Sequence, residues 1–368
     1  MNLTPLEALR RQYERFPYPP IPFLALPRRG QGADLRYSGP KAAPRILVAG
    51  CGTLETVVVA QAHPDASEVV AVDLSAESVA ISRRRLSWMR VARPWRKLPR
   101  VRFEVGNVSS LDLGEFDFVL ASNILHHNSD PSHLLKTLAG KLKPHGLMRV
   151  VTYPKGSRYW MRETSRWLKA RGLKAESEAL VRESRRAIRE LPIGNPLRSC
   201  FESQPETRTR AGLVDAFFNA CENPLSPLEW ERASVEAGLK LIREGQDENS
   251  RSDFLDDFLG DAEALSPWEK LQVLDDTWEL CANPVFWFEK TDEAHAKDRA
   301  RTTESSESLA TQLRRAEKIL TQAGKTLAEY QSWLRKAAGP RVNPRTPDEL
   351  LRGLSLVEYD LAELKARD

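Results

Sequence analysis

Cysteine is scarce in this sequence, which holds four in 368 residues. No two of them stand at CxxC spacing, and no histidine nearby completes a set of metal ligands, so we predict no metal site. A disulfide framework is typical of small secreted chains, whereas this chain is long enough to bury a core of its own. We interpret all four as reduced thiols: Cys51, Cys200, Cys221 and Cys281.

Long apolar runs and a strong excess of one charge are also missing. No uncharged stretch reaches the length of a membrane span, and the first residues lack the basic and apolar regions of a signal peptide. The formal net charge of +4 is small for this length and does not by itself indicate a nucleic-acid partner. We therefore predict a cytoplasmic globular protein with no membrane partner.

Short apolar runs alternate with helical segments over residues 41–155. The runs predict five strands, at 45–49, 68–73, 101–105, 116–121 and 147–152. Helices are expected at 54–62, 75–89 and 131–142, the second capped by Ser75 or Asp73. Continuous apolar runs indicate strands that are covered on both faces, and the alternation indicates parallel β-α-β units. Two later runs, at 238–243 and 284–290, complete a doubly wound, mostly parallel α/β sheet of seven strands, in which the last strand is inserted as a hairpin partner.

The first forty residues predict a helix followed by an extended arm. Residues 5–15 have an amphipathic pattern, and residues 16–22 contain four prolines, which remove donors and fix φ. The arm either covers the core or closes as a lid over a ligand.

The last segment has a heptad pattern. Apolar residues repeat at alternating spacings of four and three over 309–334 and again over 350–364. We expect two helices that fold back as a hairpin or pair with a second copy of the chain. Packing alone and self-association both stay open.

A glycine turn follows the first expected strand. Gly50 and Gly52 stand where that strand meets a helix, and glycine there permits a tight turn and a close backbone approach to a ligand. Asp73 ends the next strand, where an acid accepts hydrogen bonds from ribose hydroxyls. A dinucleotide fingerprint has a third glycine where this chain has Glu55, whose carboxylate disfavours a pyrophosphate. A nicotinamide-dependent oxidoreductase is therefore disfavoured relative to an enzyme whose nucleoside ligand has no phosphate.

Four motifs in order resemble the class I S-adenosylmethionine-dependent methyltransferases. Residues 46–53 resemble their first motif, and residues 106–108 resemble the segment that lies beside the adenine. Residues 123–127, followed by Asp130 and Pro131, are similar to their fourth-strand motif, and residues 142–147 resemble the turn before their fifth strand.

A narrower resemblance links two further segments to one bacterial group of these enzymes, which is often fused to tetratricopeptide repeats. The arm at 13–19 is similar to the start of that group, and residues 195–240 are loosely similar to its later segment, around 215–218.

The resemblance implies a cofactor and a set of site residues. The cofactor is S-adenosylmethionine, which lacks a phosphate and so tolerates Glu55. It would be held by Tyr18, Gly50, Cys51, Gly52, Asp73, Leu74, Asn107, Val108 and Asn123. We propose His127 and Tyr153 as catalytic candidates; one of His126 and His127 faces the acceptor, or each only caps a turn. The family usually has an acid at Val48 and a glycine at Leu54, and these departures leave open a non-catalytic binding or assembly module.

The chain is accordingly divided into five parts. These are an arm or lid (1–40), a cofactor-binding core (41–155), a helical insertion on the acceptor side (156–236), the last two strands (237–290) and a helical hairpin or coiled-coil tail (291–368). The expected activity is methyl transfer to an unidentified acceptor. A small molecule is favoured, and a protein side chain or a nucleic acid stays open.

Residues 83–102 carry nine basic side chains and no acid, with Trp88 and Trp95 among them. Basic and aromatic residues together bind nucleic-acid backbones and stack on bases. A solvated helix face with both tryptophans packed on the domain is the favoured interpretation, because the segment should lie at the end of the sheet opposite the site.

Overall fold

The computed structural model describes residues 3–22, 24–28, 30–246, 266–276 and 283–291. The helical hairpin predicted after residue 291, the self-association assigned to it and Cys281 lie outside the described residues. No helix in the described part is both long enough and apolar enough to cross a membrane.

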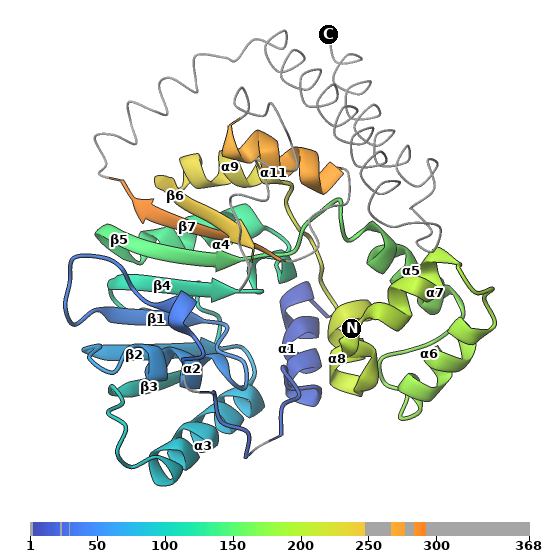
Figure 1. Ribbon diagram of the computed structural model, residues 1–368, viewed down its shortest axis with the longest axis horizontal. Helices are drawn as coiled ribbons and strands as arrows, with labels where there is room; N and C mark the ends of the chain where they lie inside the picture. Colours follow the sequence, from blue (N-terminus) through green and yellow to red (C-terminus); the bar gives the residue numbers. More distant parts are fainter. Residues whose placement is uncertain (1–2, 23, 29, 247–265, 277–282, 292–368) are drawn as a thin grey trace, which may run out of the picture.

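Seven strands form one sheet in the order β3-β2-β1-β4-β5-β7-β6 (Figure 1). Their bounds are β1 Arg45–Ala49, β2 Glu68–Asp73, β3 Val101–Val105, β4 Phe116–Ser122, β5 Leu142–Val151, β6 Leu239–Gln246 and β7 Pro284–Lys290. The first five strands pair in parallel, and β7 runs antiparallel to both β5 and β6. The predicted seven-stranded, doubly wound α/β fold is confirmed, with the last strand inserted between β5 and β6.

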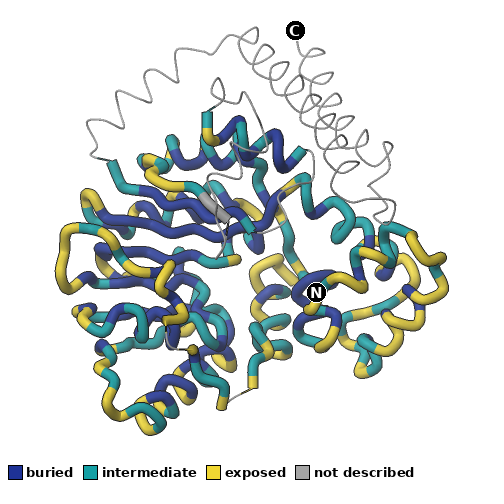
Figure 2. The backbone as a smooth tube through the Cα atoms, viewed as in Figure 1, coloured by how far each residue is buried: buried dark blue, intermediate teal, exposed yellow. Residues whose placement is uncertain are grey.

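Helices cover both faces of the sheet. The bounds are α2 Glu55–Ala62 and α3 Ala76–Ala92 on one face, and α4 Pro131–Gly140, α9 Pro227–Glu236 and α11 Pro267–Asp276 on the other. Residues 46–49 of β1 are completely buried, because alternate side chains pack into the two opposite cores. Figure 2 shows this burial along the central strands. Burying each large apolar side chain stabilises the fold by about 1.5–3 kcal/mol.

Local signals set the helix starts. Ser75 caps α3, since its hydroxyl accepts a hydrogen bond from the backbone N–H of Ser78 at 3.0 Å. Thr4 and Glu7 form a capping box at the start of α1 (Pro5–Arg15), the helix expected from the amphipathic pattern. Of the two caps considered for α3, the structure therefore uses Ser75.

The junction of α4 and β5 differs from the prediction. We expected a helix to residue 142 and a strand from 147, but α4 ends at Gly140 and β5 begins at Leu142. Leu142 is fully buried and pairs with Phe116, and the register of β4 and β5 shifts just beyond this pair. His145, in the exposed part of the strand, has a φ of +57°. Burial of Leu142 therefore extends the strand across a bulge that local turn chemistry does not reveal.

The insertion after β5 forms a helical lobe with its own core. Its helices are α5 Tyr159–Ala170, α6 Leu180–Arg189, α7 Pro196–Ser203 and α8 Arg210–Phe217, with a short 3-10 turn, η3 Pro205–Arg208, before α8. Leu168, Leu180, Phe201, Leu213 and Phe217 are buried together in this lobe. In Figure 1, α1 lies between the sheet and α8, so the N-terminal helix lies at the junction of the two parts.

The basic segment at 83–102 is only partly a solvated face. Arg85 is fully buried, and Lys97 pairs with Asp65 at 2.6 Å. Trp88 is half-buried, but Trp95 is 77% exposed, so our expectation that both tryptophans pack on the domain is wrong for Trp95. The loop that carries Trp95 is polar and leads to the start of β3, where no apolar surface covers its ring.

Candidate active site

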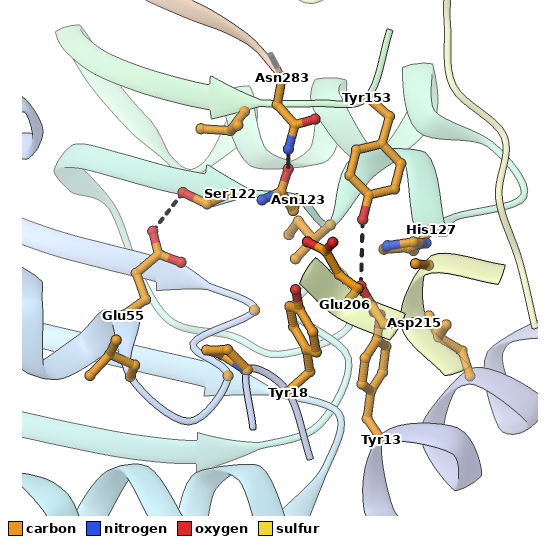
Figure 3. A pocket seen from close by; sticks show the side chains of 18 of the residues that line it. Tyr13, Tyr18, Glu55, Ser122, Asn123, His127, Tyr153, Glu206, Asp215 and Asn283 are labelled. Atoms are coloured by element: carbon orange, nitrogen blue, oxygen red, sulfur yellow. Dashed lines mark hydrogen bonds between the residues drawn. The ribbon is translucent and has the colours of Figure 1, made fainter. Parts of the chain in front are cut away.

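A cavity of about 1120 Å³ lies at the carboxyl ends of the parallel strands, between the sheet and the helical lobe (Figure 3). This edge is where open α/β sheets bind ligands. The residues predicted from the sequence all line it: Tyr18, Gly50, Cys51, Gly52, Asp73, Leu74, Asn107, Val108, Asn123, His127 and Tyr153. Segments more than 130 residues apart in the chain thus contribute to one cavity.

The glycine turn is shaped by neighbouring protein as much as by a ligand. Gly50 and Gly52 have φ of +73° and +48°, in the left-handed region that favours glycine. A Cβ at Gly50 would collide with the side chain of Ile124, and one at Gly52 would lie 2.8 Å from the carbonyl oxygen of Tyr18. The two glycines therefore allow the loop after β4 and the N-terminal arm to close on this turn.

Asp73 is the carboxylate at the end of β2. Its Oδ2 accepts a hydrogen bond from the backbone N–H of Gly52 at 2.8 Å, and its Oδ1 accepts one from Ser75 at 2.9 Å. Burial raises the pKa of Asp73, and these two hydrogen bonds oppose that rise. Each oxygen keeps a further lone pair, so the carboxylate can still accept hydrogen bonds from a ligand's hydroxyls.

The remaining residues predicted to bind the cofactor supply a side-chain amide and apolar surface. The Oδ1 of Asn107 accepts a hydrogen bond from the N–H of Ser109 at 3.0 Å, which leaves one lone pair and the two amide hydrogens of the side chain. Leu74 and Val108 add apolar surface beside it. A ligand with ribose hydroxyls and an adenine edge fits this set, and S-adenosylmethionine carries both.

One position departs from the dinucleotide fingerprint and two depart from the methyltransferase pattern. Glu55 is the first residue of α2 and lies in the cavity wall, where its Oε1 accepts a hydrogen bond from the hydroxyl of Ser122 at 2.6 Å; a carboxylate at this helix start disfavours a pyrophosphate. Val48 is fully buried in the core on the α2 side and contributes packing. Leu54 packs against the same core and also lines the cavity.

The N-terminal arm is fastened to the glycine turn. The N–H of Thr53 donates to the carbonyl of Tyr18 at 3.1 Å, and the hydroxyl of Thr53 donates to the carbonyl of Pro19 at 2.7 Å. The guanidinium of Arg85 donates to the carbonyls of Thr53 and Ile21, the latter at 2.9 Å. One buried cation therefore links the arm, the turn and α3.

The two neighbouring histidines differ in their surroundings. Both lie in a short 3-10 turn, η2 (Leu125–His127). His127 lines the cavity, and its Nδ1 donates to the carbonyl of Cys221 at 2.9 Å, so Nε2 is the unprotonated nitrogen of the neutral ring. His126 stacks on Tyr153 with ring centres 3.6 Å apart, and burial lowers its pKa, which keeps the ring neutral. Of the two, His127 faces the cavity.

A buried polar cluster completes the far side of the cavity. The hydroxyl of Tyr13 donates to Oδ1 of Asp215 at 2.8 Å, and that of Tyr153 approaches Oδ2 at 3.5 Å. Burial raises the pKa of both Asp215 and Tyr153. The guanidinium of Arg158 lies over the ring of Tyr153 and pairs with Glu222 at 3.1 Å.

Sequence reasoning named Tyr153 as a catalytic candidate but missed its partners in this cluster. Tyr13 and Asp215 are 202 positions apart, and no spacing rule connects them. The only signal was that each lies in a segment similar to the same bacterial group of methyltransferases.

Known proteins resemble the chain in sequence and in fold. The methyltransferase-domain family matches residues 47–148. The uncharacterized protein syc1184_c of Synechococcus sp. is 31% identical over 211 residues, 52% of this chain and 48% of that protein. PKMT2 from Rickettsia typhi superposes with a TM-score of 0.52 at 14% identity, over 76% of this chain and 55% of that one, and its complex with AdoHcy gives 0.53. The chain thus spans about half the length of these proteins.

The family match and the fold agree with the four motifs read from the sequence. The match covers β1 to the middle of β5, the part of the sheet that carries the glycine turn and Asp73. The structural likeness shows the fold alone, because the identity is 14%. Residues 47–148 are therefore similar to a methyltransferase domain, and the seven-stranded sheet that contains them shares its fold with PKMT2.

Proposed function

We propose that the protein transfers a methyl group from S-adenosylmethionine to an acceptor bound between the sheet and the helical lobe. The observation that carries this proposal is one cavity of about 1120 Å³ lined both by the predicted cofactor residues and by polar side chains of the lobe. Pockets for one small ligand typically measure about 300–1,000 Å³. The cavity therefore has room for a cofactor and a second reactant.

The chain's contribution would be binding, alignment and exclusion of water. Asp73 would hold the ribose hydroxyls, and Asn107 would meet the adenine edge. When bound, the cofactor supplies a methyl group that is already activated on a sulfonium. Alignment of two reactants in a closed site can then account for most of the rate.

A proton acceptor is available where the acceptor would bind. His127 lines the cavity, and in its neutral form the hydrogen bond from Nδ1–H to Cys221 leaves Nε2 as the nitrogen that can accept a proton; a positioned base typically contributes about 10²–10⁴-fold to a rate. Tyr153 is unsuited to that role, since burial raises its pKa and keeps the phenol protonated. We assign His127 as the base and Tyr153 as a positioning residue that acts through Asp215.

A small molecule is the acceptor we favour. Asp215 and Tyr153 are only 4% and 8% exposed, so the reacting group must enter deeply. Small molecules and the ends of long side chains can do so, whereas a stacked base would first have to leave its helix.

The second candidate function is that of a non-catalytic binding module. The observation that favours it is Val48, which packs in the core at a position where the family usually has an acid. Calorimetric titration with adenosylhomocysteine and S-adenosylmethionine tests cofactor binding, which both candidate functions require. We expect both ligands to bind. We expect Asp73→Ala to weaken the binding of adenosylhomocysteine at least tenfold, because a charged hydrogen-bond acceptor is lost.

Asp65→Ala, at an exposed carboxylate paired with Lys97, is the matched control and should leave the affinity unchanged. No binding of either ligand at millimolar concentration would contradict the proposed enzyme.

A further inference from the structure

The lobe side of the cavity offers hydrogen-bond acceptors in excess of donors. The acceptors are the carboxylate of Asp215, the Nε2 of His127, and the Oε2 of Glu206, which is buried and has no hydrogen-bond partner in the described part of the chain. Three of the nearby donors are already engaged. The tyrosine hydroxyls of Tyr13 and Tyr153 point to Asp215, and the Nδ1–H of His127 is bonded to a backbone carbonyl.

The same region is negatively charged. The groups that face Asp215 are Tyr13 from α1, Tyr153 after β5 and His127 from η2, and within the described residues no lysine or arginine forms an ion pair with it. Arg158 also lines the cavity and its charge acts on Asp215, but its ion pair is with Glu222. Burying a carboxylate without an ion-pair partner is unfavourable, so a positively charged ligand at this position would stabilise the charged form of Asp215.

Glu206 extends this negative character along the wall. It stands on η3, and it approaches Tyr18 closely enough that its charge helps to raise the pKa of that phenol. In Figure 3 its carboxylate is drawn above the hydroxyl of Tyr18, and both residues line the cavity. An aromatic ring beside carboxylates is a favourable environment for an ammonium group.

The rest of the wall suits a carbon chain. Tyr153 has both faces covered, by His126 at 3.6 Å and by the guanidinium of Arg158 at 3.6 Å, so it offers only its hydroxyl. Leu9 and Met161 line the same cavity with apolar surface. A ligand with a cationic N–H group on an alkyl chain meets all of these features.

We propose that this chamber binds a primary alkylammonium group, with Asp215 as its charge partner, and that an amine is the methyl acceptor. The inference rests on the proposed function. One proton passes from the ammonium to the Nε2 of His127. The nitrogen lone pair then forms the bond to the methyl carbon as the carbon–sulfur bond breaks, and sulfur keeps that electron pair. The product is a methylated ammonium and a neutral thioether, and His127 releases its proton to solvent.

Matched probes of one chain length test the binding step without turnover. Hexylamine, hexanol and hexanoate are titrated by calorimetry into the full chain saturated with adenosylhomocysteine. We expect hexylammonium to bind at least tenfold more tightly than the other two, because only it can pair with the buried carboxylates. Nα-acetyl-lysine methylamide forms a second arm. Tighter binding of this probe than of hexylamine would assign the amine to a lysine side chain, and weaker binding would assign it to a small molecule.

Two variants locate the effect. Asp215→Asn and Glu206→Gln should each weaken the binding of hexylammonium about tenfold or more and leave the affinity for adenosylhomocysteine unchanged. Asp65→Asn should change neither affinity. Retained binding of adenosylhomocysteine shows that a variant is folded. If Asp215→Asn does not fold, Glu206→Gln still tests the proposal.

The two proposals fail differently. Equal binding of the three hexyl probes, tighter hexanoate, or no binding of any probe overturns the amine inference while adenosylhomocysteine still binds. Loss of adenosylhomocysteine binding in the unaltered chain overturns the proposed function itself.

Discussion

Arg85 provides the most specific test of how the arm is held over the cofactor site. Its guanidinium is fully buried and donates to the carbonyls of Thr53 and Ile21, with a longer contact of 3.4 Å to Pro22. Each buried carbonyl left without a donor costs about 1–3 kcal/mol. Arg85→Met leaves two such carbonyls but also removes a buried cation, which offsets part of the loss. We expect the free energy of unfolding to fall by about 2–4 kcal/mol.

The assay is urea unfolding followed by circular dichroism, together with calorimetric titration of adenosylhomocysteine. Arg84→Met is the matched control, since Arg84 precedes Arg85 on α3 and its side chain is 59% exposed. The affinity for adenosylhomocysteine should also fall in Arg85→Met, because the turn at Gly52 loses its link to the arm. If Arg85→Met unfolds like Arg84→Met and binds adenosylhomocysteine with the original affinity, the assigned role of Arg85 is wrong.

Three further predictions concern the cavity wall. Gly52→Ala should lower the free energy of unfolding by about 1–2 kcal/mol and weaken the binding of adenosylhomocysteine, since the residue has positive φ and its new Cβ would press on the arm. An unchanged urea unfolding curve and an unchanged affinity in calorimetric titration would contradict this. His127→Asn should leave adenosylhomocysteine affinity unchanged but slow methyl transfer to hexylamine about 100-fold, measured by mass spectrometry of the product; an undiminished rate would remove His127 as the base. Burial raises the pKa of Asp215, so its contribution to stability is fully present below the ordinary pKa of about 3.9 and is lost as pH rises through the higher folded value. Urea unfolding at a series of pH values should therefore show a steeper decline above pH 4 for the unaltered chain than for Asp215→Asn, and equal slopes would refute the assignment.

The sheet and the cofactor side were predictable because their signals are local. β1 and β2 read as continuous apolar runs since both of their faces are buried, and Asp73 is the last residue of β2. Parallel strands bring their carboxyl ends to one edge, so the position of each motif at a strand end was enough to place it. The start of β5 was not predictable, because Leu142 joins the strand through its pairing with Phe116.

The acceptor side depends on packing between distant segments. Tyr13 belongs to an N-terminal helix and Asp215 to α8, and only the docking of α1 between the sheet and the lobe brings them within 2.8 Å. The sequence also gave no means of choosing between His126 and His127, which are adjacent and identical. Burial against Tyr153 removes one from the cavity, and a hydrogen bond to Cys221 orients the other.

The glycine turn was predicted from its role toward a ligand alone, and that reason is incomplete. Gly50 and Gly52 do line the cavity, but a side chain at either would first meet Ile124 or the carbonyl of Tyr18. The motif therefore also encodes the fit of the arm, which is a long-range contact.

The central claim is that the edge of the sheet formed by the glycine turn and Asp73 binds a nucleoside donor without phosphates. Parallel calorimetric titrations of the full chain with adenosylhomocysteine and with NAD test it most directly. We expect saturable binding of adenosylhomocysteine and none of NAD at the same concentrations, because the carboxylate of Glu55 stands at the start of α2, where it disfavours a pyrophosphate. Saturable binding of NAD without binding of adenosylhomocysteine would contradict it.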